Sequence, residues 1–269
     1  MAASARRRSR RRSMARLDLG FPGAAVDIPP FDHENAGLDE AATLNARFSN
    51  LSSREIVERA LFDLFPGRIA LVSSFGAESA VLLHVVASVD RTVPVVFIDT
   101  QRLFPETLAY RDTLIDRLGL TNVRTVAPDP AALAEKDRYK ALWMTDADQC
   151  CHIRKTEPLT RALAGFDAWF TGRKRFQAAT RAEIQFFELD GARIKVNPLV
   201  SWSSAELKSY LAEQDLPRHP LVAQGYPSIG CQPCTSKVKP GEDERAGRWR
   251  GLDKTECGIH LGESDGSGI

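Results

Sequence analysis

Hydrophobic and polar positions along the chain form two kinds of pattern, helical faces and short apolar runs. Residues 53–65 carry one helical face, in which six apolar side chains recur at helical spacing: Ile56, Val57, Ala60, Leu61, Leu64 and Phe65. Ser52 and Glu55 have the spacing of a capping box at its start. Pro66 and Gly67 end it, and the apolar run Ile69–Val72 that follows predicts a buried strand.

The same alternation continues along the chain. Strands are predicted at Ile69–Val72, Val95–Ile98, Val123–Val126, 168–171, 186–189 and Arg193–Val196, and helices at 53–65, 80–89, Pro105–Leu118 and after Ser203. The last two strands read as a hairpin with a turn at Asp190 and Gly191. From Leu216 onward the chain is rich in proline and loops. This order predicts an α/β fold, a doubly wound and mostly parallel sheet with a loop-rich C-terminal segment.

Polar loops follow three of the predicted strands, at residues 73–79, 99–102 and 172–177. The carboxyl ends of parallel strands share one edge of a sheet, where such folds bind their ligands. The first loop, Ser-Ser-Phe-Gly-Ala-Glu-Ser, leads from a strand into a helix and suits an anion held by backbone amides. The third loop contains Arg173, Lys174 and Arg175, with Arg181 shortly after, and reads either as a solvated turn or as an anion site.

Charge is unevenly distributed over the 269 residues. The net charge is +1, but residues 1–16 carry seven arginines and no acid, which leaves 29 basic against 35 acidic side chains elsewhere. The rest of the chain thus has a net charge of −6 and is not a general binder of nucleic acid. An anionic ligand would need a local cluster of basic side chains. No apolar run reaches the roughly 18 residues of a membrane helix, and we expect no membrane association.

The arginine-rich residues 1–16 are compatible with a transit-like segment, a basic arm that binds nucleic acid or membrane, or a disordered extension. Met14 could itself be the first residue of the protein. We expect a basic, disordered extension at residues 1–44, a single folded domain at 45–261 and a flexible tail at 262–269.

The five cysteines form two close pairs and one isolated residue: Cys150 with Cys151, Cys231 with Cys234, and Cys257. An odd count at this spacing does not suit a secreted disulfide framework and favours a reducing cytoplasm. Two pairs could hold structural zinc, but adjacent cysteines are awkward around one ion. Neighbouring thiolates can bind different iron atoms, so a [4Fe–4S] cluster is favoured, with Cys257 as a separate nucleophile.

Five motifs occur in order and together carry a resemblance: Ser74-Phe75-Gly76-Ala77-Glu78, residues 99–107 (Asp-Thr-Gln-Arg-Leu-Phe-Pro-Glu-Thr), residues 150–155 (Cys-Cys-His-Ile-Arg-Lys), Cys231-Gln232-Pro233-Cys234 and residues 256–261 (Glu-Cys-Gly-Ile-His-Leu). From about Ser52 to Leu261 the chain resembles the assimilatory adenosine 5′-phosphosulfate (APS) reductases, within the phosphoadenylyl-sulfate reductase family. The last three motifs are specific as a set. The resemblance implies a sheet of the adenine nucleotide alpha hydrolase-like type.

The resemblance also implies residue roles. Cys150, Cys151, Cys231 and Cys234 would hold the cluster, and Cys257 would be the catalytic nucleophile. Lys155 would lie between cluster and substrate, and Arg245, Arg248 and His260 would grip the phosphosulfate. The nucleotide pocket would be lined by Ser74, Phe75, Gly76, Leu103 and the Gly172 turn, with Arg175 and Arg181 as further substrate contacts.

The chain departs from the family pattern at two places. The turn after Gly172 reads Lys174-Arg175-Phe176-Gln177-Ala178 where Arg-Arg-x-Gln-Ser is usual, and Gln101 stands where glycine is expected. Both departures concern contacts with the substrate and leave the implied chemistry unchanged.

The implied activity is thiol-dependent reduction of APS to sulfite and AMP through an S-sulfonate on Cys257, in sulfate assimilation and cysteine biosynthesis. Only eight residues follow Leu261, so we expect no fused thioredoxin-like domain, and thioredoxin or glutaredoxin would donate electrons. The alternatives are reduction of the 3′-phosphorylated nucleotide, an adenylating ligase or tRNA thiolation enzyme, and a non-enzymatic zinc or iron–sulfur module. The oligomeric state, including a homo-oligomer, stays open.

Overall fold

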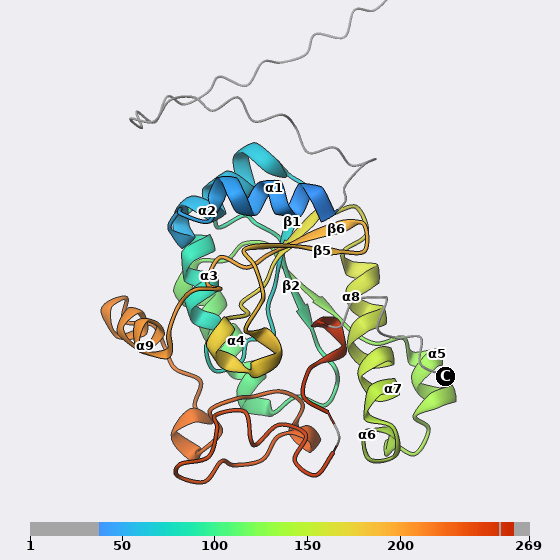
Figure 1. The fold of residues 1–269 in the computed structure, drawn as a ribbon. Coiled ribbons are helices and arrows are strands. Elements are labelled where there is room, and N and C mark those ends of the chain that lie inside the picture. The colour runs from blue at the N-terminus through green and yellow to red at the C-terminus, as the bar shows by residue number, and fades with distance from the viewer. Residues whose placement is uncertain (1–37, 253, 261–269) are drawn as a thin grey trace, which may run out of the picture.

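The computed structural model describes residues 38–252 and 254–260 (Figure 1). At its centre is a six-stranded sheet in the order β3-β2-β1-β4-β6-β5. All neighbouring strands are parallel except the β5–β6 hairpin, which is antiparallel. The strands are β1 (Ile69–Val72), β2 (Val95–Ile98), β3 (Val123–Val126), β4 (Ala168–Phe170), β5 (Phe187–Asp190) and β6 (Arg193–Val196). The predicted mostly parallel, doubly wound sheet is confirmed.

Helices cover both faces of this sheet. They are α1 (Leu38–Phe48), α2 (Ser53–Arg59) with a π-helical turn at Ala60–Leu64, α3 (Ser79–Ala87), α4 (Pro105–Leu118), α5 (Pro130–Lys136), α6 (Leu142–Thr145), α7 (Ala147–Cys151), a second π-helical turn at His152–Thr156, α8 (Glu157–Ala162) and α9 (Ser204–Glu213). Among the residues described, no helix is both long and apolar enough to cross a bilayer.

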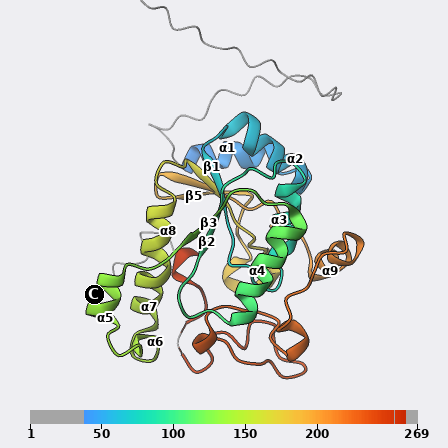
Figure 2. The ribbon, with the colours of Figure 1, turned by 180° about the vertical axis from the view of Figure 1, so that it is seen from behind.

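Side-chain alternation along the strands explains the two layers. Leu71 and Phe97 belong to the large core beneath α3 and α4, whereas Ala70 and Trp169 belong to a second cluster under α8. Successive residues of a strand face opposite sides, so the short apolar runs must be buried on both faces. Figures 1 and 2 show α3 and α4 on one side of the sheet and α8 with α5 to α7 on the other.

Local sequence signals place several helix ends correctly. Ser52 and Glu55 form the predicted capping box of α2, and Ser203 and Glu206 form that of α9. Pro105 lies in the first turn of α4, and Gly119 ends that helix with a left-handed backbone. In the hairpin, Asp190 is the last residue of β5, so the turn itself consists of residues 191 and 192.

The predicted disordered extension through residue 44 is wrong for its last part. Helix α1 starts at Leu38, and Ala41 and Leu44 are buried in the main core. Asn45 completes the docking, since its side chain bonds both the N–H and the C=O of Phe187 at the sheet edge. Apolar burial thus outweighs the turn-forming composition of the preceding chain. The predictions for residues 1–37 and 262–269 lie outside the described residues.

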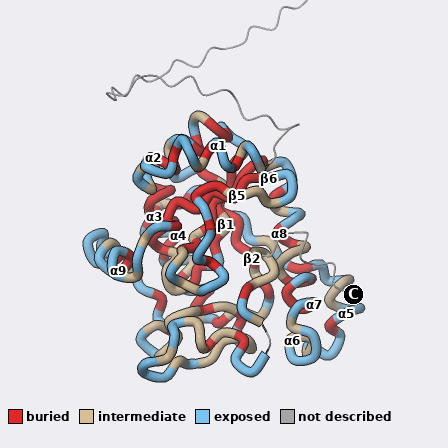
Figure 3. The backbone as a smooth tube through the Cα atoms, viewed as in Figure 1, coloured by how far each residue is buried: buried red, intermediate tan, exposed pale blue. Residues whose placement is uncertain are grey.

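The C-terminal segment is loop-rich, as predicted. From Leu216 its regular structure, within the residues described, is limited to short 3-10 turns. This segment lies along the carboxyl-end edge of the sheet, drawn in orange and red in Figure 1. Buried positions in Figure 3 follow the strands and the inner faces of the helices. The loops and the C-terminal segment therefore meet at one edge, where a site can be assembled.

Candidate active site

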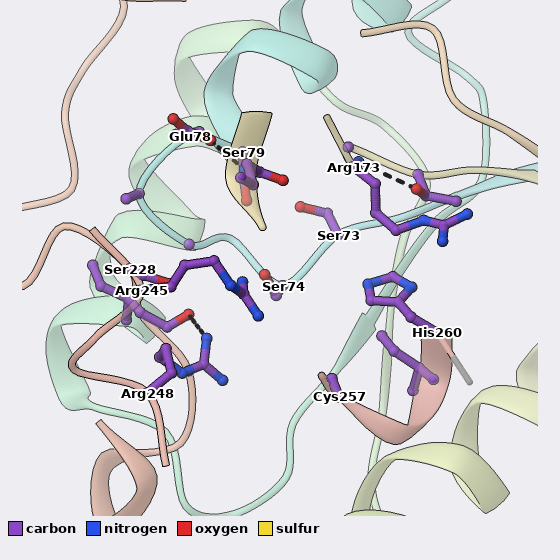
Figure 4. Close-up of a pocket in the computed structure, with 18 of the residues that line it drawn as sticks. Ser73, Ser74, Glu78, Ser79, Arg173, Ser228, Arg245, Arg248, Cys257 and His260 are labelled. Carbon is purple, nitrogen blue, oxygen red and sulfur yellow. Dashed lines mark hydrogen bonds between the residues drawn. The ribbon is translucent and has the colours of Figure 1, made fainter. Parts of the chain in front are cut away.

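A cavity of about 330 Å³ opens at the carboxyl ends of the strands. The loop after β1, the turn after β4 and the C-terminal segment all contribute to it (Figure 4). In Figure 4, Arg245 and Arg248 approach from one side, Arg173 and His260 from the other, and Ser74 and Cys257 lie between. The sequence-predicted residues that line it are Ser74, Gly76, Leu103, Lys155, Gly172, Arg181, Arg245, Arg248, Cys257 and His260.

Phe75 does not line the cavity, which corrects the expectation for this residue. Its backbone has φ 48°, in the left-handed region, and its ring is fully buried against Phe97 with centroids 5.3 Å apart. The turn therefore anchors the loop in the core while Ser74 and Gly76 face the cavity. Gln101 also has a positive φ, of 58°, a backbone conformation that glycine adopts most readily. This conformation explains why glycine is the residue expected at position 101.

Arg175 also lies outside the cavity lining, because its Nε donates to the carbonyl of Ile184. Its neighbours Arg173 and Lys174 line the cavity instead, and both are buried. Lys174 Nζ lies 2.6 Å from Glu78 of the first loop, so a buried ion pair joins two of the three polar loops. The charge run thus lies at the cavity rather than in a solvated turn, but through Arg173 and Lys174 and not through the expected Arg175.

Cys257 approaches the cavity from the C-terminal segment. Lys155 Nζ lies 3.5 Å from its Sγ. Gly258 packs on the π-helical turn that carries Lys155, and a Cβ there would lie 3.2 Å from Thr156 Oγ1. The pKa of Cys257 lies well below its usual range because Cys151 donates a hydrogen bond to it and Lys155 and Arg248 are close, although burial acts in the opposite direction. A lowered thiol pKa raises the fraction of reactive thiolate.

Arg248 is held by packing more than by hydrogen bonds. Its guanidinium lies 4.3 Å from the ring centroid of Trp249 and covers Gly230, where a Cβ would come within 2.3 Å of Nη2. Its Nη1 donates to the Ile229 carbonyl, whereas Nε is buried without a partner among the described residues. A buried donor without a partner is costly, so this nitrogen fits an anionic ligand.

His260 lines the cavity, and one of its ring nitrogens has no hydrogen-bond partner among the described residues. Its ring stacks on Trp169 with an interplanar angle of 6°, and its Nδ1 is buried without a partner among the described residues. Burial lowers the pKa of His260 well below 6.5, and Arg173, Arg181, Lys195 and Arg245 lower it further. The imidazole is therefore neutral here, amid cations that would favour an anion.

The four paired cysteines line a second, smaller cavity, together with three cationic side chains, Arg102, Arg154 and Lys155. All five cysteines are free of disulfides. Among the described residues, no group of three or more His, Cys, Asp or Glu is arranged to hold a single metal ion. Arg154 is buried, bonds Thr100 and Asp137 through its terminal nitrogens, and leaves Nε without a partner among the described residues. Four thiols with a spare cationic donor fit an anionic thiolate cluster.

The two cavities share a wall. Lys155, Cys231 and Trp249 line both of them, which places Lys155 between the thiol cavity and the nucleotide loops, as the resemblance implies. Burial alone would lower the pKa of Lys155, but the nearby sulfurs of Cys231 and Cys257 raise it above its usual value. Lys155 thus stays charged, hydrogen-bonded to Cys257 and lining the cavity of the paired thiols.

Several lining residues were not found from the sequence. Glu78 and Glu256 lie inside quoted motifs, but nothing in their spacing indicates that they pair with cations. Arg173 was part of the recognised charge run, and Trp249 follows two predicted arginines. Only the folded chain shows which members of these runs face inward.

Residues 68–237, well over half of the chain, match the phosphoadenosine phosphosulfate reductase domain. The chain belongs to this reductase family. It is 53% identical to adenosine 5′-phosphosulfate reductase of Mesorhizobium japonicum over 236 residues, covering 86% of this chain and 93% of that relative. It is 54% identical to the enzyme of the same name from a Chelativorans species, covering 82% and 91%.

A second kind of reductase is also similar. The chain is 38% identical to phosphoadenosine 5′-phosphosulfate reductase of Gloeobacter violaceus, covering 85% of this chain and 98% of that relative. Among solved structures, the phosphoadenylyl-sulfate reductase of Candida auris in a phosphate complex matches with TM-score 0.64 and 28% identity, covering 75% and 98%. The match to the reductase domain ends at residue 237, before Arg245 and Cys257.

Proposed function

We propose that this protein reduces adenosine 5′-phosphosulfate to sulfite and AMP, as a thiol-dependent adenylyl-sulfate reductase of sulfate assimilation. Two relatives above 50% identity over most of the chain carry that name. The observation that carries the chemistry is the position of Cys257, a thiol with a lowered pKa beside Lys155 at the mouth of a nucleotide-sized cavity.

In the first step the Cys257 thiolate attacks the sulfur of the phosphosulfate. A sulfur–sulfur bond forms, the sulfur–oxygen bond to the phosphate breaks, and AMP leaves with the electron pair. Arg245, Arg248 and Lys155 would neutralise the substrate and the charge that develops on the leaving phosphate. The unpartnered nitrogens of Arg248 and His260 are suitable donors to these oxygens.

The second step needs thiols from outside the chain. One thiol attacks Cys257 Sγ, sulfite leaves, and a mixed disulfide remains, which a second thiol resolves. The two thiols become a disulfide and supply both electrons that reduce the sulfur. Thioredoxin or glutaredoxin in a reducing cytoplasm fits this role, and such a compartment also keeps the five free cysteines reduced.

We assign Cys150, Cys151, Cys231 and Cys234 as ligands of a [4Fe–4S] cluster. When bound, the cluster would supply a fixed field beside Lys155, rather than electrons for the reaction. Its thiolate ligands have no proton to donate, so Cys151 could no longer donate to Cys257. Lys155 and Arg248 then remain as the causes of a lowered pKa at Cys257.

The test is intact-mass analysis after mixing the iron-loaded protein with APS in the absence of reductant. We expect one added SO₃ group, located by peptide mapping at Cys257, and its release as sulfite when thioredoxin is added. Cys257→Ser should show neither the adduct nor sulfite, a loss of at least about 10³-fold.

Parallel reactions with the 3′-phosphorylated nucleotide give the comparison of substrates. Faster adduct formation with that nucleotide than with APS would overturn the choice of substrate. An unmodified Cys257 in the wild-type protein with both nucleotides would overturn the reaction.

A further inference from the structure

The residue before the nucleophile, Glu256, occupies the basic side of the nucleotide cavity. It lines the cavity and is only 8% exposed. Its two carboxylate oxygens accept from Arg181, Nε to Oε1 at 2.6 Å and Nη2 to Oε2 at 2.7 Å. Arg245 Nη2 lies 3.5 Å from the same carboxylate, and Thr180 donates to it at 3.3 Å.

This carboxylate is bound as an anionic ligand would be. A guanidinium that bonds both oxygens of a carboxylate is the geometry by which arginine also binds phosphate and sulfate. Arg181 is itself 7% exposed, so little water screens the pair. One of the two arginines, Arg245, is a residue that the proposed function assigns to the phosphosulfate.

The pKa of Glu256 shows how strongly the two arginines hold its carboxylate. Burial alone would raise the pKa of Glu256, yet the hydrogen bonds and charge of Arg181, with Arg245, hold it below the usual value. The carboxylate therefore stays charged, and it cancels part of the positive potential of the cavity. Because Glu256 is bonded directly to Cys257 in the chain, the same contact fixes the nucleophile beside the cavity.

We propose that Glu256 is an internal competitor for the substrate anion, and that its contact with Arg181 and Arg245 holds the Cys257 segment closed until the phosphosulfate displaces it. Glu256 is thus a positioning residue that acts through Cys257 and the two arginines. The inference rests on the proposed function for the identity of the competing anion. It goes further in assigning one carboxylate both to hold the nucleophile and to weaken nucleotide binding.

The test compares Glu256→Gln with wild-type protein, both with the iron cluster loaded, and uses AMP as the probe. Glutamine keeps the shape of the side chain but frees the arginines from a charged partner. We expect AMP to bind about tenfold more tightly, which corresponds to about 1.4 kcal/mol. S-sulfonation of Cys257 at saturating APS should stay within about threefold of wild type, because the bound substrate has already displaced the side chain of residue 256 from the arginines in both proteins. A merely structural carboxylate would weaken AMP binding when replaced, so equal or weaker binding overturns the proposal.

Glu242→Gln is the matched control. Glu242 also pairs with an arginine of the C-terminal segment, Arg250, but it does not line the cavity. Its replacement should leave both the AMP affinity and the sulfonation rate within twofold of wild type. Glu256→Asp, which retains the charge, should restore weaker AMP binding.

A second measurement needs no variant. Alkylation of Cys257 by iodoacetamide, read by peptide mass, is followed in wild-type protein with sodium sulfate replacing chloride at constant ionic strength. Sulfate that takes the arginines from Glu256 should speed alkylation at least threefold, and an unchanged or slower rate would overturn the proposal. Failure of the proposed function is seen separately, as the absence of a sulfonate adduct in wild-type protein given APS.

Discussion

At the scale of single residues, the basic side of the site depends on a missing side chain. Gly230 has no Cβ, and the guanidinium of Arg248 fills that space between the backbone and Trp249. The obstruction is the far end of a flexible side chain, so the chain could accommodate a methyl group by moving Arg248 alone. The position of this guanidinium in the cavity is therefore set by a residue that has no side chain.

Gly230→Ala should displace Arg248 and leave the fold intact. We expect KM for APS to rise about tenfold, the effect of losing roughly one charge-assisted contact. The melting temperature should change by less than about 2 °C, since no backbone has to shift. Steady-state kinetics and calorimetry check both values. Gly67→Ala is a control for KM alone: the methyl group enters open space away from the cavity and KM should be unchanged, but the φ of 72° strains alanine and should lower the melting temperature.

Residue-scale prediction from the sequence succeeded where chemistry restricts the residue type. The spacing of the cysteines singled out Cys257, and the family resemblance supplied Arg248; the structure places both at the cavity. The prediction was wrong where the direction of a side chain decides whether a residue lines the cavity. A positive φ turns Phe75 into the core, and a short turn points Arg175 at a carbonyl, and neither follows from residue type.

At the scale of elements, α1 closes the open edge of the sheet. Strand β5 is the last strand, and the side chain of Asn45 bonds the N–H and C=O of Phe187 as a neighbouring strand would. Edge strands with unpaired backbone groups invite pairing with other chains. A helix that spans the predicted domain boundary thus protects the sheet.

Asn45→Ala should destabilise the fold by about 1–3 kcal/mol, because a buried donor and acceptor at Phe187 lose their partner. Urea unfolding followed by far-UV circular dichroism measures the change. Thr43→Ala removes a side-chain bond on the exposed part of the same helix and should cost less than about 0.5 kcal/mol. Equal effects of the two substitutions would contradict a special role for Asn45.

Long elements with strong signals were predictable, and short ones were not. Capping boxes, a first-turn proline and apolar runs identified α2, α4, α9 and the strands. Helices α6 and α7 have four and five residues, too few for a helical period to appear. They are held by tertiary contacts around Cys150 and Cys151, which sequence periodicity does not record.

At the scale of the whole molecule, His219 fastens the C-terminal segment to the α/β body. It is 1% exposed, its Nδ1 accepts from the N–H of Leu221, and its Nε2 bonds Thr107 of α4 at 3.0 Å. An accepting Nδ1 requires the neutral ring. Burial lowers the pKa of His219 to about 4, although Glu106 acts in the opposite direction.

Stability should therefore depend on pH between the unfolded and folded pKa values of this histidine. Above about pH 6.5 both states bind no proton here, and the stability is fully present. As the pH falls towards 4, the unfolded state takes up the proton first, so unfolding becomes easier by up to about 3 kcal/mol. Chemical denaturation from pH 7 to 4.5 measures this slope.

His219→Gln serves as the reference for the pH dependence. His84 and His260 also have lowered pKa values, so the wild-type slope is a sum. The difference between wild type and the variant isolates His219, and parallel curves across this range would contradict its role.

The overall architecture was predictable as a class but not as an arrangement. Alternating strands and helices indicate a mostly parallel sheet, and the carboxyl-end rule correctly located the site. The order of strands depends on long-range pairing, such as β1 beside β4, which local patterns do not carry. The return of residues 245–260 over the same edge is likewise a property of the folded chain.

Trp249 lines both cavities and forms part of the wall that they share. Replacing the four paired cysteines with apolar side chains would displace Trp249 from the side of the smaller cavity. The nucleotide cavity would then change shape both at Trp249 and at position 231, which line the two cavities together. Redesign of either compartment has to treat the two as one architectural unit.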